Sequence, residues 1–263
     1  MDELEVGIQV LYPTVFLRPV THRPELGISL CKSYNRWLID IWEKEQERLR
    51  WVAVLPMLSI DKALVALKTT KENGSCGVFM RGLEGERRLS HPYFYPLYEE
   101  ASRLDMPICI HSANGNFTTH DFYDDECGFA KFKLAVVGAF HSLIFDGIPD
   151  MFPKLRFAFI EVSAQWIPYA IHDLAIRFRR RGKQLKSNLL SENRIYVASQ
   201  TDDDLSYILT YAGEDNLIIG SDYGHADTAS EIETLRKLKQ DRKIGERAIN
   251  KIMDDNARAL CGI

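Results

Sequence analysis

The chain has 263 residues, of which 46% are hydrophobic and 27% are charged, and its formal net charge is -4. This balance argues against nucleic acid or an anionic membrane as the main partner, and no apolar run approaches the roughly 18 residues that a membrane span needs. The five cysteines are an odd number without CxxC spacing, which indicates a reduced, cytoplasmic setting.

The first predicted element is a buried strand over residues 6–12, a short apolar run that begins close to Met1. We therefore expect neither a signal peptide nor room for an earlier strand and helix within this chain. The run already looks like the second strand of a larger sheet. We expect the first strand of that sheet to lie upstream of Met1.

Six further strand-like runs follow at nearly regular intervals, and they are short and apolar, as strands buried on both faces are. They cover residues 50–57, 77–81, 107–112, 155–162, 194–200 and 217–223. The amphipathic segments between them predict helices over 28–50, 60–73, 93–104 and 166–181. Strands alternating with helices predict a parallel α/β sheet, and the length suits a single TIM (β/α)8 barrel domain over residues 1–263, with its first strand missing.

Polar residues stand where these strands end, and in a parallel barrel all those ends face one mouth. Arg81 closes the third run, where its guanidinium suits a bidentate contact with a substrate carboxylate or acyl oxygen, with a surface salt bridge as the alternative. His111 closes the fourth run and is a candidate metal ligand, because neutral imidazole is a preferred ligand of zinc. The polar loop that follows carries Asn114, which we expect to contact the substrate.

Glu161 ends a strongly apolar run, where a carboxylate is costly to bury unless it is paired or coordinated. It is therefore a metal ligand, an acid/base group or half of a structural ion pair. Trp166 follows closely and is a candidate substrate-binding residue, because aromatic side chains near the loops suit a flat ring by stacking. Ordinary packing is the alternative for Trp166.

Asp222 follows the last apolar run. A carboxylate there can bind a cation through one oxygen and accept a proton from metal-activated water through the other, whereas a loop-capping role is the alternative. His225, in the same loop, is a candidate substrate-binding residue. Both His225 and Asp227 could instead cap a helix that begins near Thr228.

His111, Glu161 and Asp222 are thus expected to converge on a divalent cation at the barrel mouth. We assign Asp222 and Glu161 catalytic roles as well. No nucleophilic triad, phosphate-binding loop or dinucleotide fingerprint occurs in the sequence, so other common hydrolase and nucleotide-binding chemistries find no support.

Several segments together resemble the amidohydrolase-related group of TIM-barrel metal-dependent hydrolases, which includes the aminocarboxymuconate semialdehyde decarboxylase-like enzymes. The segments that carry the resemblance are 76–81, 91–98, 107–111, 152–161, 166–169, 220–223 and 255–260, so it extends over nearly the whole chain. Many decarboxylase-like members of this group have His at the position of Glu161. The segment from Glu161 to Trp166 instead resembles the branch of the group that carries Glu there.

The resemblance implies that His111 and Asp222 bind a metal, most commonly zinc, with manganese or iron as possibilities. It also implies acid/base or metal-binding chemistry at Glu161. Members of the group begin with a first strand that carries a pair of ligands such as His-x-His, and no residues here match it. A homodimer is plausible from the resemblance alone.

Three functions remain open from the sequence. The leading hypothesis is a hydrolase that attacks an amide, ester or lactone of a small organic substrate through a metal-activated water, with Asp222 as base and Arg81 orienting the substrate. The second is a nonoxidative decarboxylase of an aromatic or enolic carboxylic acid. The third is a catalytically inactive barrel that acts as a binding subunit, which the unmatched first-strand ligands favour.

Overall fold

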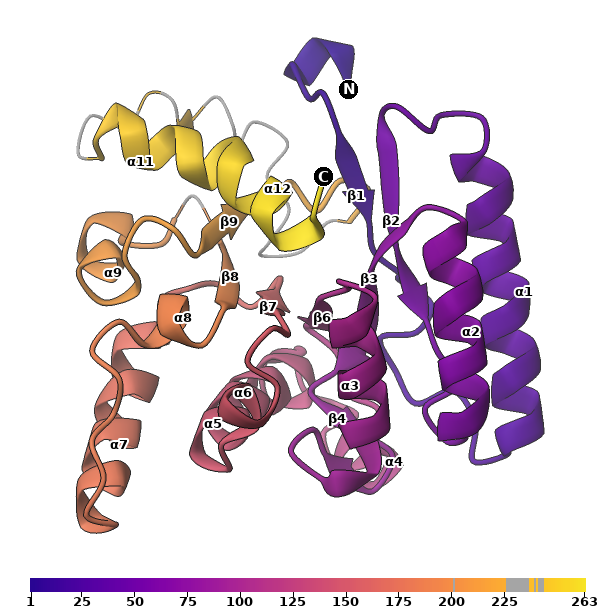
Figure 1. Cartoon of the computed structure of the whole chain (residues 1–263), viewed down its shortest axis with the longest axis horizontal. Coiled ribbons are helices and arrows are strands. Elements are labelled where there is room, and N and C mark those ends of the chain that lie inside the picture. Colours follow the sequence, from indigo (N-terminus) through magenta and orange to yellow (C-terminus); the bar gives the residue numbers. More distant parts are fainter. Residues whose placement is uncertain (201, 226–236, 239, 241–243) are drawn as a thin grey trace.

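The protein folds around one curved parallel sheet, seen in a computed structural model that describes all residues except 201, 226–236, 239 and 241–243. Seven strands lie in the order β1-β2-β3-β6-β7-β8-β9, and each pairs in parallel with the next (Figure 1). Their bounds are β1 (Gln9–Leu11), β2 (Leu49–Val54), β3 (Ser75–Arg81), β6 (Ile108–His111), β7 (Phe157–Ile160), β8 (Ile195–Ser199) and β9 (Leu217–Ile219). All seven runs that the sequence predicts as strands are confirmed.

Helices connect the strands and cover the outside of the sheet (Figure 1). They are α1 (Pro24–Trp42), α2 (Ile60–Glu72), α3 (Tyr95–Arg103), α4 (Phe117–Phe122), α5 (Leu134–Phe145), α6 (Ile148–Met151), α7 (Ile167–Arg180), α8 (Leu189–Glu192), α9 (Leu205–Ala212), α11 (Glu246–Asn250) and α12 (Asn256–Cys261). Short 3-10 turns at Asp2–Leu4 and Pro92–Phe94, and π-helical turns at Phe129–Lys133 and Lys251–Asp255, complete the described helices. A small antiparallel ribbon pairs β4 (Leu83–Glu84) with β5 (Arg87–Arg88).

Helix α1 differs most from its predicted bounds of 28–50. It begins at Pro24, because proline fits the first turn of a helix, and it ends at Trp42. The Trp42 indole packs directly over Gly74, where a Cβ atom would lie 2.1 Å from the ring. Gly74 also has φ of 84°, so this turn requires glycine on two grounds.

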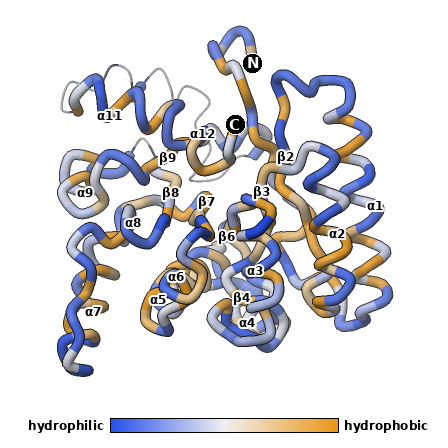
Figure 2. Tube along the Cα trace, in the orientation of Figure 1, coloured by the Kyte–Doolittle hydropathy of each residue, from blue (hydrophilic) through white to orange (hydrophobic). Residues whose placement is uncertain are grey.

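The core consists of two layers that alternate along each strand, as the two faces of a sheet require. One face packs against the helices through residues such as Trp51, Met80 and Phe157, while the other fills the inside of the curve through residues such as Val52, Phe79 and Ala158. Both sets are almost completely buried. Each large apolar side chain so buried contributes about 1.5–3 kcal/mol, and the polar residues concentrate on the outer helices (Figure 2).

The C-terminal helix is fastened to the sheet by Arg156, which lies between β7 and the preceding loop. Its Nε donates to the carbonyl of Leu260 at 2.8 Å, and its Nη1 lies 2.5 Å from Oδ1 of Asp105. Arg156 itself is buried. The last turn of α12 is thereby held against the end of the sheet at which the strands begin.

The sheet curls like a barrel but does not close within the described residues, because β1 and β9 are its two edges and pair only on one side. A closed barrel of this class has eight strands. The α/β architecture of the sequence prediction is therefore confirmed, whereas the upstream first strand and the single-domain division stay predictions. Among the described residues no helix has the length and apolar character that crossing a membrane demands.

Candidate active site

The ends of β6, β7 and β9 deliver three of the predicted residues to one large cavity. His111, Glu161 and Asp222 all line it, together with β1, the residues after β8 and the C-terminal helices. The volume is about 1060 Å³, at the upper end of the range for small-molecule sites. We call it the main cavity.

His111 and Glu161 form a buried pair in this cavity. Nε2 of His111 lies 3.0 Å from Oε2 of Glu161, and the two side chains are 5% and 9% exposed. The imidazole packs near Tyr12 and Phe79, with ring centroids at 5.5 and 6.0 Å. Nδ1 of His111 is buried and has no hydrogen-bond partner in the described part of the chain, so this nitrogen keeps its capacity to bind a cation or a substrate group.

Asp222 and His225 form a second pair on the loop after β9. Nδ1 of His225 lies 2.9 Å from Oδ1 of Asp222, and Nε2 lies 3.2 Å from the hydroxyl of Thr14. Thr14 follows β1, so this chain of contacts bridges the two edges of the open sheet at their carboxyl ends. His225 is thereby oriented by both of its ring nitrogens.

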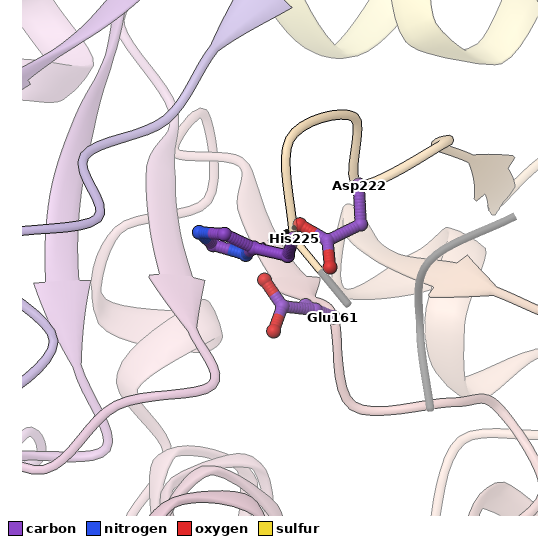
Figure 3. Close-up of side chains that lie close together, drawn as sticks. All are labelled: Glu161, Asp222 and His225. Atoms are coloured by element: carbon purple, nitrogen blue, oxygen red, sulfur yellow. Dashed lines mark ion pairs between the residues drawn. The ribbon is translucent and has the colours of Figure 1, made fainter. Parts of the chain in front are cut away.

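Donor atoms of Glu161, Asp222 and His225 all lie within 4.8 Å of one another, and the three side chains point toward a common centre (Figure 3). Two carboxylates and an imidazole form a donor set that zinc, manganese and iron accept. His111 adjoins the set through the contact of its Nε2 with Oε2 of Glu161. These residues therefore fit a divalent cation. The sequence predicted Glu161 and Asp222 as ligands but assigned His225 to the substrate.

The backbone is strained where these carboxylates stand. Glu161, Ser163 and Asp222 have φ of 60°, 59° and 45°, in the left-handed region that residues other than glycine rarely occupy. Such conformations cost on the order of 1–3 kcal/mol each and persist only where surrounding contacts fix them. Two of the three, Glu161 and Asp222, carry the carboxylates that line the main cavity.

Asp203 is a site residue that the sequence analysis did not identify. Its carboxylate accepts hydrogen bonds from the hydroxyl of Ser163, and from the backbone N–H groups of Ala164 and Gln200 at 2.8 Å each. It thus ties the loop after β7 to the loop after β8 and fixes the strained segment that carries Glu161. The run of three aspartates at 202–204 gave no indication of which one turns inward.

Arg81 lies outside the main cavity and already has a carboxylate partner. Its Nε lies 3.1 and 3.2 Å from the two oxygens of Glu84, its Nη2 donates to the same carboxylate, and its Nη1 donates to the carbonyl of Arg18 at 3.0 Å. Glu84 thus occupies the bidentate face that we expected a substrate carboxylate to take. The pair is half-buried rather than a surface salt bridge, since the two side chains are 14% and 2% exposed.

Two other predicted substrate-binding residues are engaged in local structure and do not line the main cavity. Asn114 is fully buried, donates to the carbonyl of Lys131 and accepts from the N–H of Asn116. The Trp166 indole donates to the carbonyl of Ser163 and packs on Phe140 at a centroid distance of 4.8 Å. Their contact with a substrate stays a prediction. Asp227 and Thr228 lie outside the described residues.

Comparison with known proteins shows the family of this chain and identifies solved structures that share its fold. A family model described as amidohydrolase matches residues 18–263. An amidohydrolase from Mycobacterium avium subsp. paratuberculosis is 20% identical with a TM-score of 0.83, and the match covers all of this chain and 72% of that one. No curated protein matches the chain.

Two decarboxylases share the same fold. The 2,6-dihydroxybenzoate decarboxylase from Rhizobium is 18% identical with a TM-score of 0.80, covering 100% of this chain and 86% of that one. The 5-carboxyvanillate decarboxylase from Novosphingobium aromaticivorans, solved with manganese and 4-hydroxy-3-methoxy-5-nitrobenzoic acid, is 17% identical with a TM-score of 0.83, covering 100% and 78%.

Proposed function

This chain belongs to the amidohydrolase family and is an enzyme, and we propose that it is a metal-dependent nonoxidative decarboxylase of an aromatic or enolic carboxylic acid. The fold that it shares over its full length with two aromatic acid decarboxylases supports this reaction over the hydrolysis that the sequence favoured first. The main cavity, at about 1060 Å³, has room for an aromatic carboxylic acid.

The observation that carries the proposal is the buried contact between His111 and Glu161. Decarboxylation breaks the bond between the ring carbon and the carboxylate, releases CO₂ and requires a proton at that carbon. With Nε2 of His111 at 3.0 Å from Oε2 of Glu161, a proton can be shared between these two largely buried groups. Glu161 would donate this proton to the carbon that loses CO₂, and His111 would then protonate Glu161 again.

Asp222 and His225 would hold the cation, and the Glu161 carboxylate lies close enough to join them whenever it is deprotonated. A divalent ion bound there would stabilise the negative charge of the substrate carboxylate and of a neighbouring oxygen. Thr14 would keep His225 in place through its contact at 3.2 Å. Manganese or zinc suits this donor set, and iron is a further possibility.

Hydrolysis of an amide, ester or lactone is the second candidate. The contact between Nδ1 of His225 and Oδ1 of Asp222 supports it, because a carboxylate oriented by an imidazole suits the role of general base toward water. In that reaction Asp222 would accept the proton of the attacking water, and Glu161 would act on the leaving group.

An assay of CO₂ release separates the two reactions. Purified protein, supplied in turn with manganese and zinc, is given hydroxybenzoates and other aromatic acids, and in parallel aryl esters and lactones. We expect CO₂ release without ester or lactone cleavage. Cleavage without CO₂ would instead establish the hydrolase, and neither reaction together with no stoichiometric metal would indicate the inactive binding subunit.

We also propose that an eighth strand completes the barrel between β1 and β9. The two unpaired edges both line the main cavity, and a strand between them would close the sheet and reach the cation from the side that the described residues leave open. Expression of the chain with its in-frame upstream codons tests this. Metal stoichiometry and thermal stability should both rise, whereas an unchanged value of each would count against the strand. A homodimer, measurable by light scattering, remains a proposal from the family.

A further inference from the structure

A second pocket of about 160 Å³ lies at the carboxyl ends of β2 and β3. Among the described residues, none that lines it also lines the main cavity. Phe79 is the wall between them, because it lines the second pocket while its ring stands 6.0 Å from the imidazole of His111. The pocket is therefore a separate space beside the candidate active site.

The size and walls of the second pocket suit one six-membered ring. An apolar protein cavity of roughly 150 Å³ binds benzene, and this pocket is of the same size. Its apolar walls include Phe16, Phe79 and Phe117, together with Val54 and Met57. Aromatic walls favour a flat aromatic ligand, because rings gain offset or edge-to-face contacts in addition to the burial of their area.

One side of the pocket is polar and carries an arginine paired with a glutamate. Arg81 and Glu84 both line it, and Glu84 is almost completely buried. A guanidinium has five N–H donors, of which the contacts to Glu84 and to the carbonyl of Arg18 use three. One hydrogen on Nη1 and one on Nη2 are left for a ligand oxygen.

The position of Arg81 is built into the backbone. Gly115 lies so close that a Cβ atom there would stand 2.6 Å from Nε of Arg81 and 2.5 Å from the carbonyl oxygen of Leu83. The guanidinium is thus pressed between Glu84 and a glycine backbone that no larger residue could replace without displacement. A fixed donor of this kind is preorganised for a ligand.

We propose that the second pocket binds a neutral hydroxylated aromatic ring of phenol size, with the ring against Phe16 and Phe79 and the hydroxyl oxygen accepting from Arg81. A carboxylate suits the pocket less well, because the two guanidinium groups that line it, of Arg81 and Arg87, are matched by the carboxylates of Glu84 and Glu86. A further anion would also meet the buried Glu84 carboxylate. A hydroxyl accepts from the guanidinium and can donate its own proton to Glu84. This site is independent of the cation and of the reaction proposed above.

The probe for this site is 4-fluorophenol, observed by fluorine NMR with the full chain after removal of metal by a chelator. We expect line broadening that excess phenol reverses, and at least threefold weaker binding of 4-fluorobenzoate. The blocking variant is Gly27→Leu, since Gly27 lines the pocket and a Cβ there meets only Thr21 Cγ2, at 3.7 Å. Leucine is also a better helix former than glycine, so α1 should tolerate it.

Gly27→Leu should weaken 4-fluorophenol binding at least tenfold, while His111→Ala, which changes no residue that lines the second pocket, should leave it within twofold. Binding that is lost in His111→Ala and kept in Gly27→Leu would overturn the proposal by locating the ring in the main cavity. Tighter binding of 4-fluorobenzoate than of 4-fluorophenol would overturn the assignment of a neutral ligand. Circular dichroism of both variants confirms that each is folded before the comparison.

Discussion

Nε2 of His111 lies 3.0 Å from Oε2 of Glu161, and neither side chain is more than one-tenth exposed. The two residues end neighbouring strands, β6 and β7, which pair in register from Ile108 opposite Phe157 to His111 opposite Ile160. Strand pairing thus brings His111, the last residue of β6, next to Glu161, the first residue after β7, and Asp203 holds the segment that follows Glu161. Because the pair is buried, truncation of either side chain would leave the other without this contact.

Replacement of His111 by alanine or of Asp222 by asparagine should abolish turnover and lower the bound metal, because each removes a donor from the candidate site. Activity and metal content by elemental analysis are measured together. His172→Ala, an exposed change on α7, is the control and should alter neither. Near-normal turnover in His111→Ala or in Asp222→Asn would remove that residue from the site.

Glu161→Gln should lower the rate by about 100-fold or more, since a positioned acid/base group typically contributes 10²–10⁴. Thermal unfolding should change little, because glutamine keeps one hydrogen bond to His111 and the same backbone conformation. The exposed change Glu99→Gln is the matched control. An unchanged rate combined with a lowered melting temperature would show that Glu161 is only half of a structural ion pair.

Asp203→Asn should reduce both activity and stability, because it weakens the three hydrogen bonds that hold the loops after β7 and β8 together. The cost in the free energy of unfolding should be about 1–3 kcal/mol, the range for a buried donor left unsatisfied. Asp202→Asn, on the same loop but exposed, should cost far less in urea titrations. Equal effects of the two variants would contradict the role assigned to Asp203.

Acid should destabilise the attachment of the C-terminal helix. The hydrogen bond from Arg156 lowers the pKa of the Asp105 carboxyl below its ordinary value. The pair therefore contributes stability that is fully present above about pH 4, the unfolded pKa, and is lost as the pH falls through the lower folded pKa.

Asp105→Asn isolates that charge, because asparagine also tolerates the φ of 54° found there. We expect a loss of about 0.2–1 kcal/mol at pH 7, as for exposed ion pairs, and a smaller further loss on acidification than in the parent. Melting temperatures from pH 7 down to pH 3 measure both. Parallel curves for the two proteins would exclude the pair as a source of acid sensitivity.

Removal of metal by a chelator should lower the melting temperature, and readdition of manganese or zinc should restore it. A ligand that binds only the folded state at 100 times its dissociation constant adds about 2.7 kcal/mol. The double change Glu161→Gln with Asp222→Asn supplies the control, since the ion should then have little effect. If the melting temperature of the parent protein were the same with and without each ion, the carboxylates would not bind one.

The sheet could be predicted from the sequence because strands buried on both faces are continuous apolar runs, and all seven such runs are strands. The positions of His111, Glu161 and Asp222 followed from the same rule, since the parallel order brings their strand ends together. His225 as a possible donor and Asp203 as a tie between loops could not be predicted. Their roles depend on side-chain directions in irregular segments, and the periodicity of apolar residues does not predict those directions.

Arg81 shows a different limit. The sequence predicted a guanidinium at the end of β3, and it is there, but the carboxylate three residues later had no pattern to mark it as a partner. The short ribbon of β4 and β5 turns Glu84 back onto Arg81, and a ribbon of two-residue strands leaves too weak a signal for prediction. The binding experiment with 4-fluorophenol tests whether Arg81 contacts a ligand in the second pocket.

β1 and β9, the two edges of the described sheet, also line the main cavity on either side. In a closed barrel the rim loops are the single entrance, and they alone select what enters. Here the main cavity extends along the flank of the sheet, from Glu161 and Asp222 down to the C-terminal residues Cys261 and Ile263. The eighth strand proposed above would thus cover the flank of the cavity, so that it would restrict access to the rim as well as complete the sheet.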